Sequence, residues 1–253
     1  MTGPDGPGRG RGAQLIVAGG AALAGAYLVP GLAGLIARRN ADGRAVPDIL
    51  SRFGIADRTQ GGRGVGLTFD DGPHPDGTPA VLELLATRGA RATFFLVGEQ
   101  VVRNPGLAAE IVAGGHRIGL HCDRHRNLLR LGPVAVGEDI RRARATIEDA
   151  TGVEIDLYRP PYGVFNAAAL AIARTSGWRP LLWSHWGRDW EATATPESIA
   201  GLLTGPGLGD GSVLLAHDSD DYSAAGSWRR TLAALPLVLD ELDRRGLRLT
   251  TRV

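Results

Sequence analysis

Several polar residues of this 253-residue sequence have the types and spacing to bind a metal ion and to move protons. Asp70 and Asp71 are adjacent, His121 and His125 form an H-x-x-x-H pattern, and His217 follows much later. One carboxylate and two imidazoles from separate turns suffice to bind zinc and leave one position open. The other aspartate would then face the substrate water. Each group alone is more typical of a turn or a surface, so the elements that carry the groups decide the prediction.

The elements that would position these residues alternate between strands and helices from residue 64 onward. We expect strands at 65–69, 92–97, 117–121, 156–159, 180–184, 212–217 and 247–251. Helices are expected at 78–89, 105–113, 133–150, 166–176, after Thr195, and at 228–245 with an interruption at Pro236. This alternation predicts an α/β fold with a parallel sheet, either a small (β/α) barrel of about seven units or an open doubly wound sheet.

The polar residues lie at the carboxyl ends of the expected strands. Asp70 and Asp71 follow the first strand, His121 ends the third, Arg159 ends the fourth, Asp189 follows the fifth and His217 ends the sixth. The carboxyl ends of parallel strands meet on one face, where ligand sites are built. We therefore expect these residues to form a single site.

The motifs that contain these residues resemble those of a known family. They are TFDDGPHP (68–75), ATFFLVG (92–98), HCDRH (121–125), RPPYG (159–163), RDW (188–190) and LLAHD (214–218). In this order they are similar to the motifs of polysaccharide deacetylases, the NodB-homology domain of carbohydrate esterase family four. The resemblance covers residues 64–253. It implies a distorted (β/α) barrel that hydrolyses N-acetyl or O-acetyl groups on polysaccharides with a divalent metal, usually zinc.

The resemblance implies a metal centre with a base beside it. Asp71, His121 and His125 would bind the metal. Asp70 would be the general base that takes a proton from the attacking water. Arg159 would pair with Asp70 and hold it ionised and oriented.

The resemblance also implies an acid and a pocket for the acetyl group. His217 would be the general acid that protonates the leaving amine, and Asp189 would raise its pKa. Tyr162 would offer its backbone N–H to the oxyanion of the tetrahedral intermediate. Leu215 and Trp190 would line the pocket for the acetyl methyl, with ordinary core packing as a nearly equal alternative.

Two positions depart from the family pattern. Trp186 stands where the fourth motif usually has its first Asp, and we expect it to stack on a sugar. Cys122 stands where Ser or Thr is usual; a small buried thiol is the main expectation and a metal ligand the alternative. His74 and His116 match no essential motif position and are expected in turns or at the surface, and His185 is a candidate for the cleft lining.

Residues 1–63 differ in composition from the rest of the chain. Residues 1–12 are rich in Gly, Pro and Arg, and residues 13–37 contain no charged side chain over a length that can span a membrane. A cleavable signal peptide, an uncleaved anchor and a buried soluble helix are the alternatives. We expect a tail with a membrane or signal segment at 1–39, a linker at 40–63 and a catalytic domain at 64–253.

The composition excludes several other chemistries. Cys122 is the single cysteine, which excludes an intrachain disulfide and a multi-cysteine metal site. The 28 basic residues are all Arg, so lysine-dependent catalysis is excluded. A net charge of +1 gives no electrostatic signature of nucleic-acid binding. We expect a monomer with no nucleic-acid partner.

These observations predict a metal-dependent hydrolase that removes N-acetyl groups from a glycan, with peptidoglycan or another envelope polymer as the first candidate. An O-acetyl esterase, a small-molecule amidohydrolase and a non-catalytic glycan-binding or membrane protein are the alternatives. The presence of both Asp70 and His217 favours an enzyme. We expect a membrane-anchored or secreted protein at the cell surface, although the arginines that follow residue 37 favour a cytoplasmic domain by the positive-inside rule.

Overall fold

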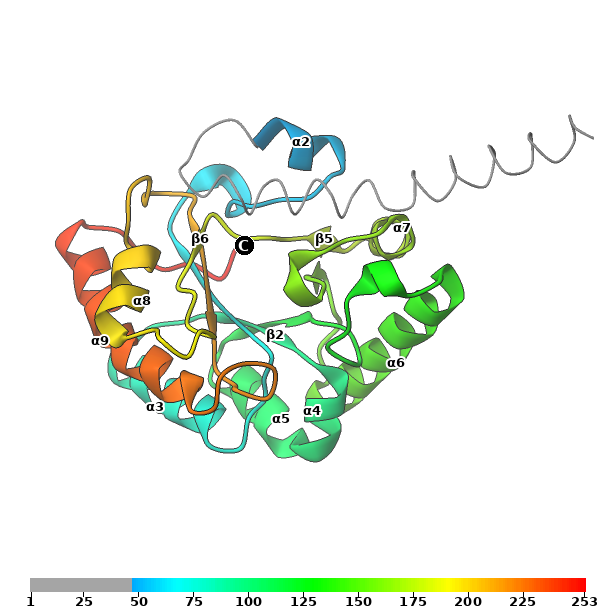
Figure 1. Ribbon diagram of the computed structural model, residues 1–253, viewed down its shortest axis with the longest axis horizontal. Coiled ribbons are helices and arrows are strands. Elements are labelled where there is room, and N and C mark those ends of the chain that lie inside the picture. Colours follow the sequence, from blue (N-terminus) through cyan, green and yellow to red (C-terminus); the bar gives the residue numbers. More distant parts are fainter. Residues whose placement is uncertain (1–46) are drawn as a thin grey trace, which may run out of the picture.

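The computed structural model describes residues 47–253, and the segment 13–37 that we expect to enter a membrane lies outside this range. Within the described range, no helix combines the length and the apolar character needed to cross a bilayer. Seven parallel strands form a sheet that curls into an incomplete barrel, with helices around its outside (Figure 1). The predicted distorted (β/α) barrel is therefore confirmed.

The strands are short and run through the centre of the molecule. They are β1 (Gly66–Asp70), β2 (Thr93–Leu96), β3 (Arg117–Leu120), β4 (Leu157–Tyr158), β5 (Arg179–Pro180), β6 (His185–Trp186) and β7 (Val213–His217). They pair in the order β5-β4-β3-β2-β1-β7-β6. Every residue of β1 and β2 is buried, which explains why these strands read as continuous apolar runs rather than alternating patterns.

Eight α-helices of the described residues surround the sheet. They are α2 (Pro47–Arg52), α3 (Gly77–Thr87), α4 (Gly98–Arg103), α5 (Pro105–Ala113), α6 (Pro133–Thr151), α7 (Ala167–Thr175), α8 (Pro196–Leu203) and α9 (Ser227–Arg244). Local signals start several of them. Pro occupies the first turn of α5, α6 and α8, and the Asn166 side chain accepts a hydrogen bond from Ala169 N at the start of α7.

Some elements differ from the sequence prediction. The strand expected at 247–251 forms only one bridge, between Leu249 and Val65, and the seventh strand is β6 instead. β6 has two residues, which is too short to produce a hydrophobic pattern. The helix α9 continues through Pro236, where we expected an interruption. Although proline removes one helical hydrogen bond, Leu235 and Val238 beside it are buried in the core and hold the helix in place.

Part of the segment 40–63, which we expect to be a linker, packs on the domain. Ala56 forms a parallel bridge with Leu181 beside β5, and Arg58 forms an antiparallel bridge with Ser212 just before β7. These bridges connect residues 56–58 to the edge strand β5 and to the segment that precedes β7. The boundaries of the catalytic domain at 64–253 remain a prediction.

Candidate active site

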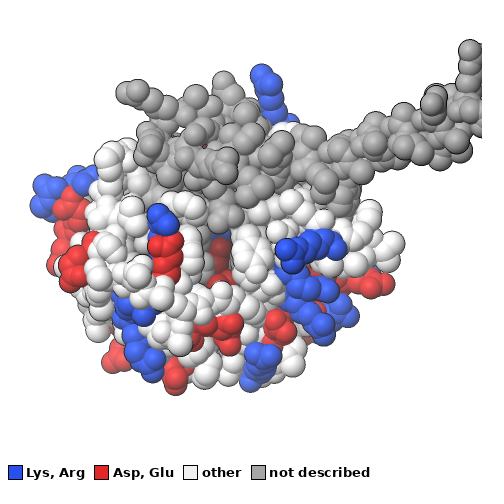
Figure 2. All heavy atoms as spheres, in the orientation of Figure 1, with Lys and Arg blue, Asp and Glu red and all other residues white. Residues whose placement is uncertain are grey.

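A pocket opens at the carboxyl ends of β1, β3 and β7, with a volume of about 140 Å³. It is lined by Asp70, Asp71, His121, His125, Tyr162, Gly163, Trp183, Trp186, Trp190, Leu215, His217, Tyr222 and Ser223. Acidic atoms are visible at the bottom of the hollow in the centre of this face (Figure 2). Arg159 and Asp189 are fully buried directly behind the lining. The fold thus brings together all the site residues expected from the sequence.

The turns that carry the site have an unusual backbone. Among residues 47–253, four residues other than Gly have a positive φ: Asp71 (80°), Cys122 (67°), Tyr162 (60°) and Arg188 (50°). Such a conformation costs roughly 1–3 kcal/mol per residue and concentrates at functional sites. At Asp71 it turns the chain at the end of β1, so that the carboxylates of Asp70 and Asp71 both reach the pocket.

Asp71, His121 and His125 form a cluster that fits a metal ion. The His121 Nε2 and His125 Nε2 atoms lie 3.4 and 3.3 Å from Asp71 Oδ1, and the three ligand atoms are all within 4.8 Å of one another. Asp71 Oδ1 is buried and accepts no hydrogen bond from the described residues. A buried carboxylate oxygen without a donor is costly, and a cation between these atoms would satisfy it.

The two histidines are oriented in different ways. His121 Nδ1 lies 2.8 Å from the carbonyl oxygen of Arg159, which can only accept, so Nδ1 carries a proton and Nε2 is the nitrogen that faces Asp71. The His125 ring is instead held between aromatic rings, at 4.5 Å from Tyr162 and 4.4 Å from Tyr222. Burial, opposed by the charge of Asp71, lowers the pKa of His125 to about 4, so its imidazole is in the neutral form that metals require.

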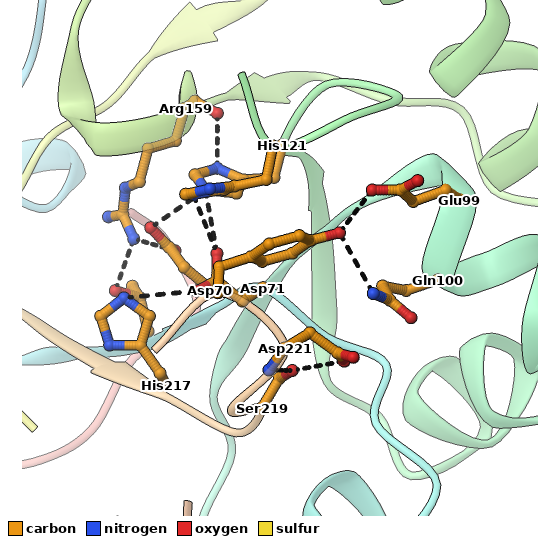
Figure 3. A network of polar contacts seen from close by, with 12 residues as sticks. Asp70, Asp71, Glu99, Gln100, His121, Arg159, His217, Ser219 and Asp221 are labelled. Atoms are coloured by element: carbon orange, nitrogen blue, oxygen red, sulfur yellow. Dashed lines mark hydrogen bonds and ion pairs between the residues drawn. The ribbon is translucent and has the colours of Figure 1, made fainter. Parts of the chain in front are cut away.

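Asp70 is fixed by a buried arginine. Arg159 Nη1 donates to Asp70 Oδ1 at 2.6 Å and to Thr68 Oγ1 at 2.9 Å. The remaining guanidinium nitrogens donate to the carbonyl oxygens of Leu181 and Leu182, and the group stacks over the Phe95 ring. Asp70 Oδ2 lies on the pocket side, 3.9 Å from His121 Nε2 (Figure 3). One carboxylate oxygen is therefore anchored and the other faces the pocket.

His217 is fixed by a buried carboxylate. Its Nδ1–H donates to Asp189 Oδ1 at 2.8 Å, and its backbone N–H donates to Asp189 Oδ2 at 2.7 Å. Thr231 Oγ1 also donates to Asp189 Oδ2, at 2.7 Å. Burial disfavours a charged imidazole, but the carboxylate of Asp189 outweighs it and raises the pKa of His217 to about 10. At neutral pH this residue can therefore donate a proton from Nε2.

An aromatic wall covers the side of the pocket near His217. Trp183 and Trp186 stack with centroids 6.1 Å apart, and Trp190 follows at 5.3 Å from Trp186 and 5.6 Å from the His217 ring. All three indoles are partly exposed, whereas Leu215 below them is 2% exposed. Partly exposed indoles in a pocket are suited to contact sugar rings and an acetyl methyl group.

Sequence reasoning missed Tyr222, which lies beyond the last motif. Its ring stacks on His125 with an interplanar angle of 15°. Its hydroxyl donates to Glu99 Oε1 at 2.7 Å and accepts from Gln100 Nε2 at 3.1 Å, which connects the metal site to α4 (Figure 3). The motif pattern ends at Asp218, so the only signal was an aromatic residue in the following acidic loop. Trp183 was also missed as a lining residue.

The single cysteine and the three histidines outside the essential motif positions do not line the pocket. Cys122 is a buried thiol, 3.5 Å from the Tyr158 hydroxyl, and burial raises its pKa. His74 lies in the turn before α3, as expected. His116 lies in the turn between α5 and β3, one of its two expected places, but its side chain is buried and accepts from Ala92 N at 3.1 Å, so the surface alternative was wrong. His185 does not line the pocket, because its Nε2 points to the carbonyl oxygen of a loop residue, Pro206, at 3.3 Å.

The curled parallel sheet, with an Asp-His-His cluster that could hold a metal ion at its carboxyl end, places the chain in the (β/α)-barrel class. The model of the polysaccharide deacetylase family matches residues 57–181. The chain is 36% identical over 208 residues to a chitooligosaccharide deacetylase of Azorhizobium caulinodans, covering 79% of this chain and 98% of that protein. The chain belongs to the polysaccharide deacetylase family, as its motifs predicted.

Two further comparisons agree with this membership. A peptidoglycan-N-acetylglucosamine deacetylase of Bacillus cereus is 35% identical over 189 residues, which cover 74% of this chain and 85% of that protein. The solved structure of a family 4 carbohydrate esterase from Streptomyces lividans, in complex with acetate, has a TM-score of 0.66 and 33% identity. It covers 74% of this chain and 91% of that chain. The similarity thus extends over most of the described barrel.

Proposed function

We propose that this protein is a metal-dependent deacetylase that removes N-acetyl groups from a polysaccharide containing N-acetylglucosamine, such as peptidoglycan. The observation that carries the proposal is the placement of Asp70 and His217 on the two sides of the Asp-His-His cluster, each held by a buried partner of opposite charge. The names of the two curated relatives support N-acetylglucosamine polymers as the substrate class.

Asp71, His121 and His125 would hold the metal, and we propose zinc. Two neutral imidazoles and one carboxylate are a ligand set that zinc favours, and three protein ligands leave a position for the reacting groups. When bound, the metal supplies Lewis-acid polarisation of the acetyl carbonyl and of the attacking water.

Asp70 would act as the general base. Its Oδ1 is occupied by Arg159, so Oδ2 is the atom that takes the proton from the attacking water. The fixed guanidinium prevents the carboxylate from rotating away from the pocket. In this account Arg159 positions the base and exchanges no proton itself.

His217 would act as the general acid. Its Nε2–H would donate to the departing nitrogen, which leaves as a neutral amine only if it is protonated. The backbone N–H of Tyr162, beside the metal site, would donate to the oxyanion, and Leu215 and Trp190 would enclose the acetyl methyl group. A proton donor that stays charged at neutral pH assists amide cleavage more than ester cleavage, because an alkoxide needs less help to leave.

The decisive experiment measures acetate released from an N-acetylglucosamine tetramer. The wild type should be active, should lose activity with a chelator and should regain it on addition of zinc. Elemental analysis should find about one divalent ion in the wild type and little in His125→Ala, with His74→Ala as the matched control. No acetate from the metal-loaded wild type would overturn the function, and equal metal content in His125→Ala would overturn the ligand assignment.

We also propose that residues 13–37 hold the enzyme at the membrane as a monomer with its barrel outside the cell. The charge-free length of this segment supports the proposal. Protease treatment of intact cells should degrade the barrel if it is outside. A barrel that is protected until the cells are lysed would reverse the orientation.

A further inference from the structure

A second groove adjoins the catalytic pocket at His125 and Tyr162. Its volume is about 450 Å³, and it is lined by His125, Arg126, Asn127, Arg130, Leu131 and Tyr162. His125 and Tyr162 line both this groove and the catalytic pocket. A polymer that places one sugar at the metal would therefore extend a neighbouring sugar into this groove.

The charge of the groove is positive. Arg126 donates through Nη2 to the buried Asp139, but its side chain is 40% exposed, and its buried Nε has no acceptor among the described residues. Arg130 is exposed, and no carboxylate of residues 47–253 lies within ion-pair distance of it. Asp123, the nearest other carboxylate along the chain, is occupied by Arg142 at 2.7 Å. Basic side chains gather over α6 and beside the hollow, at the right of Figure 2.

The turn that carries these arginines is rigidly built. Leu128 is fully buried, and its carbonyl oxygen accepts from the buried Asn166 Nδ2 at 2.8 Å. The Asn127 side-chain oxygen accepts from Leu129 N at 3.0 Å, so its NH₂ group is directed away from the turn as a further donor. Arg130 N donates to the Asn127 carbonyl oxygen at 3.1 Å. The groove therefore offers several donors and a positive charge from a fixed backbone.

We infer that this groove binds a carboxylate on the sugar next to the one that is deacetylated, so that the substrate is an acidic glycan rather than a neutral one. The inference rests on the proposed deacetylase function and specifies its substrate class. Guanidinium groups bind carboxylates through charge-assisted hydrogen bonds. Residues 47–253 supply no carboxylate to Arg130; a carboxylate on the sugar would pair with it, whereas a neutral glycan would not.

The test compares two tetrasaccharides of alternating N-acetylglucosamine and N-acetylmuramic acid, one with free lactyl carboxylates and one with these groups as methyl amides. For the wild type, kcat/KM should be about two to five times higher on the acid than on the amide, as expected for an exposed charge pair. This ratio should fall as salt is added. It should approach one in Arg130→Gln and stay at the wild-type value in Arg141→Gln, an exposed arginine on α6.

The outcomes separate this inference from the function on which it rests. A wild-type ratio near one, or an unchanged ratio in Arg130→Gln, would contradict carboxylate binding in the groove. Acetate release from the neutral N-acetylglucosamine tetramer would still support the deacetylase function. If no substrate is turned over, the deacetylase proposal fails. Calorimetry with the metal-loaded wild type then still tests the groove: tighter binding of the acid than of the amide supports it, and equal binding overturns it.

Discussion

The two sides of the catalytic pocket each contain a carboxylate paired with a cation, but the pairs face in opposite directions. On one side Asp70 faces the pocket, and the fully buried Arg159 lies behind it at 2.6 Å. On the other side His217 faces the pocket, and the fully buried Asp189 lies behind it at 2.8 Å. The group that faces the pocket, a carboxylate on one side and an imidazole on the other, therefore distinguishes the proton acceptor from the proton donor.

The buried partners are held by different neighbours. Arg159 is bound by two carbonyl oxygens that follow β5, whereas Asp189 is bound by Thr231 of α9. Both pairs adjoin the Asp-His-His cluster. Asp70 Oδ2 lies 3.9 Å from His121 Nε2, and His217 Nε2 lies 3.9 Å from Asp71 Oδ2. A base and an acid on either side of one centre are what amide hydrolysis requires.

The largest expected effect comes from removing the base. Asp70→Asn should lower kcat/KM on an N-acetylated glycan by about 10²–10⁴-fold, because an amide cannot accept the proton of the attacking water. Metal content should be unchanged, since Asp71 remains. Asp149→Asn, an exposed carboxylate on α6, is the matched control. Near-wild-type activity of Asp70→Asn would show that another group is the base.

Removing the general acid should lower activity by an amount that depends on the leaving group of the substrate. His217→Ala should lower kcat/KM for an N-acetyl substrate by about 10²-fold and for the O-acetyl analogue by clearly less, because an amine needs protonation more than an alkoxide does. Acetate release from the two analogues by the same enzyme preparation measures this. Equal losses on both would remove His217 from leaving-group protonation.

The smallest effect concerns Tyr222, which stacks on a ligand of the metal cluster. Tyr222→Leu removes the stacked ring and should weaken metal affinity by about tenfold, as is typical when a group that orients a ligand is lost. Tyr222→Phe keeps the ring, loses only the hydrogen bonds to Glu99 and Gln100, and should weaken affinity less. Competition with a chromogenic chelator gives both values. If neither variant changes the affinity, the stacking on His125 is packing alone.

Much of the site was predictable because its residues follow strands with strong apolar patterns. β1 and β2 are buried on both faces, so the positions of Asp70 and Asp71 at a strand end could be read directly. Trp183 and Tyr222 could not be predicted, because they lie in irregular segments whose path depends on packing. The two-residue β6 was missed because its pairing with β7, rather than its own pattern, makes it a strand.

The positive groove was also beyond the sequence prediction. Arg126 and Arg130 lie in a chain that contains 28 arginines and carries a net charge of only +1. Their net charge depends on which carboxylates pair with them: Asp139 pairs with Arg126, and Asp123 pairs with Arg142 outside the groove, which leaves Arg130 without a carboxylate partner among residues 47–253. Ion pairing in three dimensions, which has no pattern in the sequence, decides where positive charge remains.

The pH profile of Asp189→Asn tests the opposed orientation of the two pairs most directly. In the wild type, His217 is charged below its raised pKa of about 10, so activity should persist into alkaline solution and fall as the pH rises through that value. Without the carboxylate, the pKa should fall toward the ordinary histidine value of 6.5, and the alkaline limb of kcat/KM should move to lower pH. An alkaline limb that stays in place in Asp189→Asn, with the Asp149→Asn control unchanged, would contradict the assignment of His217 as the acid.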